Sequence, residues 1–303
     1  MDETKGSLTA VATAFMRAYH AANHSPKIFD DFIAKELFTA EEDRLMRKGL
    51  AQCLPIFEPQ CAAEGLDEET ALDRVMRHQM STVLCRSRYA EDCLEEAVAA
   101  GTEQYVILGA GMETYALRRP DMAARLTIFE VDHPATQTAK RNRFAQLGWA
   151  IPDHLRFVPF DFTEQPLAEA LAQAAYVPHR ASFFSLLGVS YYLSRENLFG
   201  TLRTVAENAT PGSAIVFDYF HEDAFCPEKA DTRMQALQML VRHTGEPMQT
   251  GLHPVSLVAE LSAAGFALQE NLGPEELSRR YFQDRTDGLH AYAHVHLARA
   301  VVV

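Results

Sequence analysis

The chain has 303 residues, of which 48% are hydrophobic and 23% are charged, as is typical of a globular protein. Its formal net charge of −13 and the lack of a basic patch disfavour nucleic acid as a partner. The start lacks the apolar core of a signal peptide, and no apolar run approaches the roughly 20 residues needed to cross a bilayer. The five cysteines form no Cys-x-x-Cys pair. We therefore expect a cytoplasmic protein with reduced cysteines and no membrane span.

The first 100 residues show apolar residues at helical spacing and no convincing strand. Residues 11–19 and 28–34 follow this pattern on either side of Pro26, and residues 66–80 and 89–99 follow it again. The pattern predicts a helical N-terminal extension over residues 1–100, which we expect to act as a lid over the rest of the chain.

After Gly101, short apolar runs alternate with helical patterns. The expected strands are residues 105–108, 126–131, 155–160, 181–187, 214–218 and 291–297. Strands that alternate with helices predict an α/β fold with a mostly parallel sheet. Because no flexible linker separates the helical block from the sheet, we expect one domain over residues 1–303. Its core is expected over residues 101–303, with a helical insertion at about residues 222–245.

The first expected strand ends in the turn Gly109-Ala110-Gly111. Glycines allow a tight turn and let a ligand approach the backbone, and the next helix offers its N-terminal amides. In an open parallel sheet, ligands bind beyond the carboxyl ends of the strands. The turn is therefore a candidate cofactor site, although a plain strand-to-helix turn would have the same sequence.

Acidic residues end the next two strands. The second strand ends in Glu130-Val131-Asp132, about 20 residues after the glycines, where an acid can accept both ribose hydroxyls of an adenosyl group. Glu130 and Asp132 share one face of the strand, and Asp132 is preferred because it lies at the tip. Asp161 ends the third strand and either accepts from an adenine amino group, with Phe162 against the ring, or caps the next helix.

The glycine spacing discriminates between cofactors. A dinucleotide site has the pattern Gly-x-Gly-x-x-Gly around a pyrophosphate, and the third glycine position here is Thr114. S-adenosylmethionine has no pyrophosphate and tolerates this residue. The turn and the two acids together therefore predict a site for an adenosyl cofactor without a pyrophosphate.

Two segments resemble the signature segments of the leucine carboxyl methyltransferase family, and more closely its bacterial branch of S-adenosylmethionine-dependent methyltransferases. The segments are Gln104-Tyr105-Val106-Ile107-Leu108-Gly109-Ala110-Gly111-Met112-Glu113-Thr114 and Phe129-Glu130-Val131-Asp132-His133-Pro134. The resemblance implies that the cofactor is S-adenosylmethionine, with S-adenosylhomocysteine as the product. Agreement continues through Leu187-Gly188-Val189-Ser190-Tyr191-Tyr192-Leu193 and covers nearly the whole chain. The resemblance implies a Rossmann-like methyltransferase fold in which residues 291–303 supply an antiparallel last strand.

The resemblance also implies an arginine before the sheet that binds the methionine carboxylate of the cofactor. Arg86 and Arg88 both fit the motif, and Arg86 is favoured. Lys27 is the nearest match to a lysine that serves the same carboxylate in the eukaryotic branch, although it is offset. That branch also has a glutamate at the cofactor site where this chain has Leu187, so the role of the glutamate does not carry over.

Methyl transfer needs few catalytic groups, because most of its acceleration comes from positioning the reactants and excluding water. A carboxylate acceptor is already ionised, whereas a hydroxyl acceptor needs a base. His221, after the fifth strand, is a candidate base, and Tyr192 is a candidate for the substrate pocket; surface and core roles are the alternatives. His294 and His296 are expected to share a face of the last strand, but no acid or cysteine completes a metal site.

We therefore predict an S-adenosylmethionine-dependent O-methyltransferase that acts on a small-molecule hydroxyl or on a carboxylate, without a metal. The first alternative is an NAD(P)-dependent oxidoreductase on a similar fold, which the missing third glycine disfavours. The second is a protein that binds S-adenosylmethionine without turnover. No oligomeric state is predicted.

Overall fold

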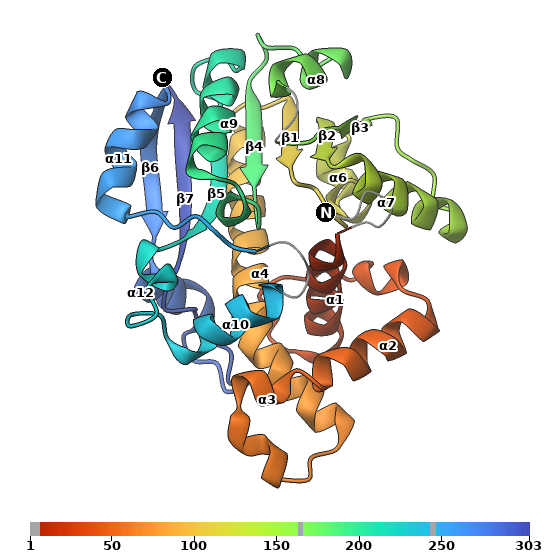
Figure 1. The fold of residues 1–303 in the computed structure, drawn as a ribbon. Helices are drawn as coiled ribbons and strands as arrows, with labels where there is room; N and C mark the ends of the chain where they lie inside the picture. The colour runs from red at the N-terminus through yellow and green to blue at the C-terminus, as the bar shows by residue number, and fades with distance from the viewer. Residues whose placement is uncertain (1–6, 163–165, 243–246) are drawn as a thin grey trace.

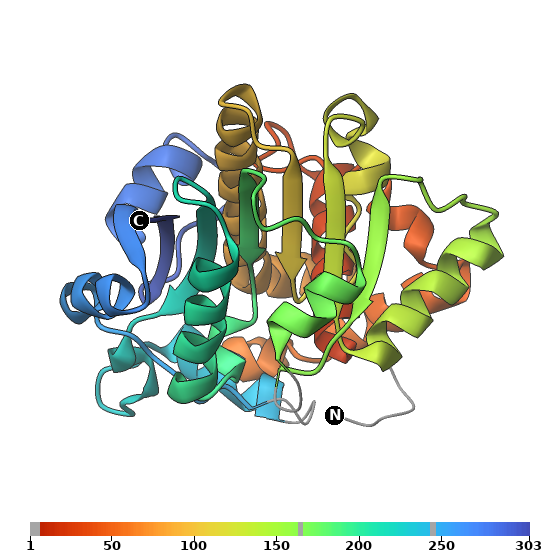
Figure 2. The same ribbon diagram turned by 90° about the horizontal axis from the view of Figure 1, so that it is seen from above.

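A computed structural model describes residues 7–162, 166–242 and 247–303. The chain forms one seven-stranded sheet with helices on both faces (Figures 1 and 2). The strands are β1 (Gln104–Leu108), β2 (Thr127–Asp132), β3 (Leu155–Pro159), β4 (Ser182–Leu186), β5 (Ala214–Phe220), β6 (Phe266–Leu272) and β7 (Val295–Val302).

The strand order is β3-β2-β1-β4-β5-β7-β6. The pairs from β3 through β5 are parallel, and β7 is antiparallel to both of its neighbours. This arrangement confirms the predicted α/β class, the mostly parallel sheet and the antiparallel last strand. The chain runs outward from β1 to β3 and then returns to β4 beside β1. Such a switch point opens a ligand-binding crevice beyond the strand ends.

Two strand predictions need correction. The strand β6 was not predicted: it lies at the edge of the sheet, and its centre, Gln269-Glu270-Asn271, is polar and partly exposed, so it gives no apolar run. The strand expected over residues 291–297 instead begins at Val295 and ends at Val302. His294 lies in the turn before it, so His294 and His296 do not share a strand face.

The helices are α1 (Leu8–Asn23), α2 (Ala40–Ala51), α3 (Leu54–Phe57), α4 (Glu68–Ala99), α5 (Tyr115–Arg118), α6 (Pro120–Ala123), α7 (Pro134–Leu147), α8 (Leu167–Gln173), α9 (Arg195–Asn208), α10 (Thr232–Arg242), α11 (Pro254–Ala263) and α12 (Pro274–Leu277). Short 3-10 or π turns cover Ala34–Leu37, Pro59–Ala63, Ser190–Tyr192, Glu222–Phe225 and Ser278–Phe282. Across the described ranges, no helix combines the length and the apolar composition of a membrane span.

Alternate side chains of the central strands enter two apolar clusters, one on each face of the sheet. Ile107 and Ile128 join the cluster that contains α1, α4 and Met234 of α10. Val106 and Phe129 join the cluster that contains α8, α9 and α11. Burial on both faces explains why β1 is apolar after its first residue, Gln104.

The predicted helical extension is present as α1 to α4, described from residue 7. The helical segment expected over residues 28–34 is not present: this stretch is irregular and leads into the 3-10 turn Ala34–Leu37. Among these helices, α4 has 32 residues and crosses the centre of the sheet, where it contacts β4, β5 and β7 (Figure 2). The predicted insertion after β5 is present as α10, which contacts α3; residues 243–246 lie outside the described part. The division into one domain stays a prediction.

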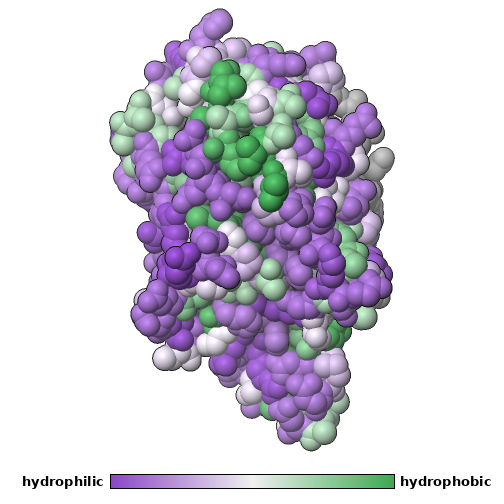
Figure 3. Space-filling view, turned by 90° about the vertical axis from the view of Figure 1, so that its left-hand side faces the viewer, coloured by the Kyte–Doolittle hydropathy of each residue, from purple (hydrophilic) through white to green (hydrophobic). Residues whose placement is uncertain are grey.

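The face that carries α11 and β6 is mostly polar, with an apolar area in the upper part of the view (Figure 3). Two valines of α11, Val255 and Val258, are exposed. This surface lies on the far side of the sheet from α1 and therefore outside the region of the switch point (Figure 1).

Candidate active site

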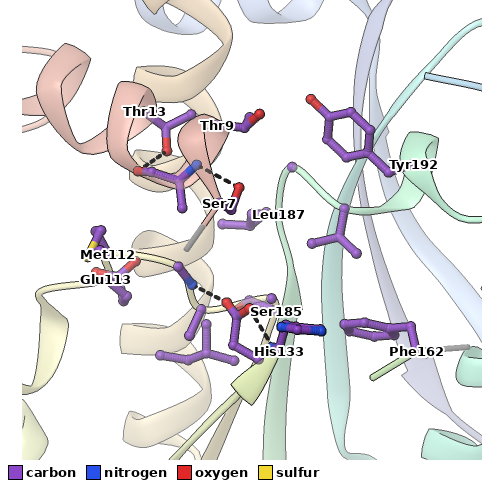
Figure 4. A pocket seen from close by; sticks show the side chains of 18 of the residues that line it. Ser7, Thr9, Thr13, Met112, Glu113, His133, Phe162, Ser185, Leu187 and Tyr192 are labelled. Carbon is purple, nitrogen blue, oxygen red and sulfur yellow. Dashed lines mark hydrogen bonds between the residues drawn. The ribbon is translucent and has the colours of Figure 1, made fainter. Parts of the chain in front are cut away.

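A cavity of about 580 Å³ lies at the switch point (Figure 4). Its volume falls in the range of about 300–1,000 Å³ that is common for small-molecule sites. Its walls come from the β1–α5 turn, the segments after β2, β3 and β4, and the first turns of α1. The candidate residues among its lining are Arg86, Gly109, Ala110, Gly111, Asp132, Asp161, Phe162, Leu187 and Tyr192.

The glycine turn lies directly under the first helix. Gly111 has a positive φ of 52°, and a Cβ atom added to it would lie 3.0 Å from Cβ of Ala10 in α1. The backbone amides of Gly109 and Ala110 both donate to the carbonyl of Val131 at 2.8 and 3.2 Å, which joins the turn to the end of β2. Glycine is therefore required at position 111 both for the turn and for the close approach of α1.

Asp132 is fixed at the tip of β2. One carboxylate oxygen accepts from the amide of Gly111, and the other accepts from the amide of His133 at 2.7 Å. Burial raises the pKa of Asp132, and the two backbone amides oppose that rise. The carboxylate is held rigidly against the glycine turn, with oxygen lone pairs left for further donors.

A second group lies beyond β3. His133 accepts from the amide of Ala135 through Nδ1 at 3.2 Å, so the N-terminus of α7 fixes the ring and leaves Nε2 towards Asp161, 3.7 Å away. The Phe162 ring packs edge-on against Phe160 and lies beside His133 in the cavity wall (Figure 4). This end of the cavity therefore combines a carboxylate with flat rings.

Arg86 lines the opposite wall, where α4 meets β4 and β5. Its Nη1 donates to Oη of Tyr191 and to Oδ2 of Asp218, both at 3.0 Å. Arg86 and Asp218 are both buried. Burial alone would lower the pKa of the guanidinium, but Tyr191 and Asp218 reverse the direction and raise it. Burial also raises the pKa of Tyr191 to about 12. Arg86 is thus a fixed cation at the cavity wall.

Three predicted cofactor residues are not brought to the cavity. Arg88 points away on α4 and pairs with Asp92 at 2.7 Å. Lys27 is exposed and pairs with Asp30 at 2.9 Å. Glu130 shares the strand face of Asp132 but lies deeper, where it forms a buried ion pair with Lys140 of α7. For Arg88 and Glu130 the sequence pattern gave the right element but not the direction or depth of the side chain.

Of the two candidate catalytic residues, the structure brings only Tyr192 to the cavity. Tyr192 lines the cavity, with its ring opposite Thr9 of α1 (Figure 4). His221 follows β5 as expected, but its Nδ1 accepts from the amide of Asp223 at 3.1 Å and its ring lies beside His253, outside the cavity lining. The structure therefore does not bring the candidate base His221 to the cavity.

Sequence reasoning missed two buried ions near the site, Arg17 and Asp218. Arg17 of α1 donates through Nε to Asp31 at 2.9 Å and through Nη2 to the carbonyl of Met112 at 2.7 Å, which joins α1 to the glycine turn. Asp218 is fully buried near the end of β5. The available signal was a charged residue inside an apolar run, since such a residue needs a buried partner.

Glu113, which follows the glycine turn, was also missed as a lining residue. Its Oε1 accepts from the amides of Thr114 and Tyr115 at 2.7 and 3.0 Å. Burial acts to raise its pKa, but Arg17 and Arg118 outweigh burial and keep the pKa below its usual range. No group of three or more His, Cys, Asp or Glu side chains in the described part of the chain could hold a metal ion.

A doubly wound sheet, a glycine turn at the switch point and an acid at the tip of the next strand define a Rossmann-like protein with a candidate cofactor site at the switch point. The family described as leucine carboxyl methyltransferase matches residues 10–206. The chain belongs to the leucine carboxyl methyltransferase family. This confirms the predicted family and the predicted class of enzyme, an S-adenosylmethionine-dependent methyltransferase.

Relatives agree with this assignment. A Bacillus subtilis (strain 168) protein named "Putative S-adenosyl-L-methionine-dependent methyltransferase YktD" is 38% identical over 99% of both chains. Two solved structures share the fold: "a putative methyltransferase from Thermobifida fusca YX" at 15% identity (TM-score 0.55, covering 99% of this chain and 96% of that one), and a DUF574 family protein from Streptomyces avermitilis MA-4680 at 12% identity (TM-score 0.53, covering 96% and 97%).

Proposed function

We propose that the protein transfers the methyl group of S-adenosylmethionine to an oxygen atom of a small-molecule hydroxyl or carboxylate. The observation that carries the proposal is the composition of the cavity. It joins Asp132 and Asp161 at one end to Arg86 at the other, and it continues to a wall made by α1 and Tyr192. This arrangement suits a cofactor with an adenosyl end and an amino-acid end, beside an acceptor.

The residues at the glycine turn fit the adenosyl part of the cofactor. Asp132 would accept from the ribose hydroxyls, since its oxygens keep free lone pairs beside the turn of Gly109 to Gly111. Asp161 would accept from the adenine amino group, with Phe162 against the ring. Any larger residue at position 111 would meet Ala10 and close this space.

Arg86 and Leu187 fit the amino-acid part. Arg86 would bind the methionine carboxylate through Nη2, for which the described residues provide no hydrogen-bond partner. Leu187 would pack along the aliphatic chain of the methionine, because it lines the same wall. Arg88, Lys27 and Glu130 have no part in this proposal, since they point elsewhere.

When bound, S-adenosylmethionine supplies an electrophilic methyl group on a positively charged sulfur. The residues of the chain contribute alignment and exclusion of water, which account for most of the rate in such displacements. The helix α1 covers the cavity with Thr9 and Thr13, and Arg17 holds it against the carbonyl of Met112. A covering helix held by a buried ion pair suits a site that must exclude water.

The acceptor would lie between α1 and Tyr192. Two backbone contacts fix the position of Tyr192: its amide donates to the carbonyl of Val189 at 2.9 Å, and its carbonyl accepts from the side chain of Gln249 at 2.5 Å. The ring of Tyr192 would therefore orient the acceptor from a fixed wall. A carboxylate acceptor needs no base there, whereas a hydroxyl acceptor must lose a proton during transfer.

The test is transfer of label from S-adenosylmethionine carrying a radioactive methyl group to a panel of small hydroxyl and carboxylate compounds. We expect labelled product and an equal amount of S-adenosylhomocysteine, and neither with the Asp132→Ala variant. Binding of S-adenosylmethionine without transfer to any oxygen acceptor would contradict the proposal. The NAD(P) alternative and the non-catalytic alternative are not favoured by the family match.

A further inference from the structure

Asp218 is a buried carboxylate that lies just outside the cavity. It is 0% exposed, near the end of β5. Its Oδ1 accepts from the amide of Gly188 at 2.6 Å, and its Oδ2 accepts from Arg86 at 3.0 Å. A buried carboxylate is costly unless it is paired and hydrogen-bonded, and a buried ion pair contributes little net stability compared with apolar residues of the same shape. The contacts of Asp218 therefore point to a role in placing its partners.

The first partner is the guanidinium of Arg86. Asp218 and Tyr191 both accept from Nη1. A Cβ atom on Gly188 would lie 2.5 Å from Nη2 and 2.8 Å from Cζ, so the guanidinium packs directly on the backbone of this glycine. Nη2 keeps no partner within the described ranges, although Arg86 lines the cavity. One side of the guanidinium is thus held by protein groups, and the other is left for an anion.

The second partner is the turn after β4. Besides the amide of Gly188, the hydroxyl of Ser190 donates to the backbone carbonyl of Asp218 at 2.5 Å. Gly188 has a positive φ of 73°, a conformation that glycine adopts without strain. This turn carries Leu187 and Tyr192 into the cavity wall. Asp218 therefore joins the arginine and the turn into one rigid unit.

We propose that Asp218 is a positioning residue, which orients Arg86 so that the guanidinium binds the carboxylate of the amino-acid part of the cofactor. Tyr191 supports it through the same nitrogen. The inference rests on the proposed function, in which Arg86 meets that carboxylate. It predicts that Asp218 affects only ligands that possess the amino-acid part.

The experiment compares two ligands by calorimetry on the full chain. S-adenosylhomocysteine has the adenosyl and amino-acid parts, whereas 5′-methylthioadenosine keeps the adenosyl group and the sulfur but lacks the amino acid. Asp218→Asn keeps the shape and an acceptor for Gly188 but loses the charge that holds Arg86. We expect binding of S-adenosylhomocysteine to weaken roughly tenfold to a hundredfold, with binding of 5′-methylthioadenosine unchanged within about twofold.

The matched control is Glu91→Gln. Glu91 lies on α4, as Arg86 does, and the substitution removes the carboxylate that pairs with Arg118 of α5. It should change binding of neither ligand. Should Asp218→Asn fail to fold, Tyr191→Phe carries the test, with a loss of roughly threefold to tenfold for S-adenosylhomocysteine alone. Equal losses for both ligands, or no loss for either, would overturn the role of Asp218. If the wild-type protein binds neither ligand, it is the proposed function that fails.

Discussion

Among the proposed site residues, Asp132 is expected to contribute most to binding of the cofactor. It is held by two backbone amides, and an alanine in its place removes both acceptors that would face the ribose hydroxyls. We predict that Asp132→Ala weakens binding of S-adenosylhomocysteine by on the order of a hundredfold or more, measured by calorimetry. The exposed Asp121→Ala is the control. Normal binding by a folded Asp132→Ala protein would show that the adenosyl site is wrongly placed.

A substitution of Gly111 tests the same site through the conformation of the backbone turn. A valine at this position combines a φ of 52° with a Cβ contact of 3.0 Å to Ala10. We predict that Gly111→Val loses cofactor binding while its circular dichroism stays that of a folded protein. Gly148→Ala is a matched control, since Gly148 has a φ of 67° but nothing within 4 Å of an added Cβ. The site assignment fails if both variants bind alike.

That the proposed adenosyl-site residues line one cavity was predictable from the sequence, because the carboxyl ends of neighbouring parallel strands meet at one edge. That rule places Gly111, Asp132 and Asp161 together once the strands are recognised. It gives no information on pairs such as Arg86 and Asp218, which are 132 positions apart in sequence. The alternation of side chains along a strand also does not show how far from the strand tip a side chain lies. For this reason Glu130 was expected in the cofactor site, whereas it forms a buried ion pair with Lys140.

At the scale of elements, the buried side chain of Arg17 adds a polar link between α1 and the glycine turn. Arg17 bonds to Asp31 and to the carbonyl of Met112, and its loss leaves Asp31 buried with fewer donors. We predict that Arg17→Gln lowers the free energy of unfolding by about 3 kcal/mol and speeds hydrogen exchange in α1. Urea unfolding and exchange mass spectrometry measure the two effects.

Arg279→Gln provides the comparison for Arg17. Its partner Glu276 lies one turn away, and both side chains are exposed. Screening by water limits the contribution of such a pair to at most about 1 kcal/mol, so little change is expected. Similar destabilisation by both variants would mean that Arg17 has no special part in holding α1.

A strand was predictable from the sequence where both of its faces are buried, and not where solvent reaches part of it. The buried β1 gave a clear apolar run, and β4 gave apolar residues interrupted by two serines. The edge strand β6 gave none, because solvent reaches its polar centre. The start of β7 was placed four residues early. Ala291 and Tyr292 extend the apolar run of the strand, but they lie in the irregular segment before it, where Tyr292 is buried in the core.

On the scale of the whole molecule, the N-terminal helices and the sheet share a core. One apolar cluster contains Phe15 of α1, Leu84 of α4 and Ile107 of β1. The sequence showed a helical block without a linker, but it could not show which helix covers the switch point, because that depends on contacts such as Arg17 with Met112 across 95 positions. Shared packing links the stability of the covering helix to that of the sheet.

Buried histidine in this shared core should make the whole fold sensitive to acid. His20 of α1 is 0% exposed, and its Nε2 accepts from the amide of Ile28 at 2.9 Å. Burial, then the neighbouring His24 and Arg285, lower the pKa of His20 from 6.5 to about 3. Between these two values the unfolded chain binds a proton that the folded chain does not. Stability is therefore complete above pH 6.5 and falls as the pH falls towards 3.

We predict that His20→Gln, whose side-chain oxygen can still accept from Ile28, flattens this dependence. For the wild type, His20 alone should lower the free energy of unfolding by about 2 kcal/mol between pH 7 and pH 5, and the variant should lack that part of the loss. Urea unfolding at both pH values measures the difference, with the exposed His290→Gln as the control. An equal pH dependence in wild type and His20→Gln would mean that His20 is not held neutral in the folded protein. Because His20 lies on the same helix as Arg17, such a result would also weaken the view that α1 is packed as tightly as the sheet it covers.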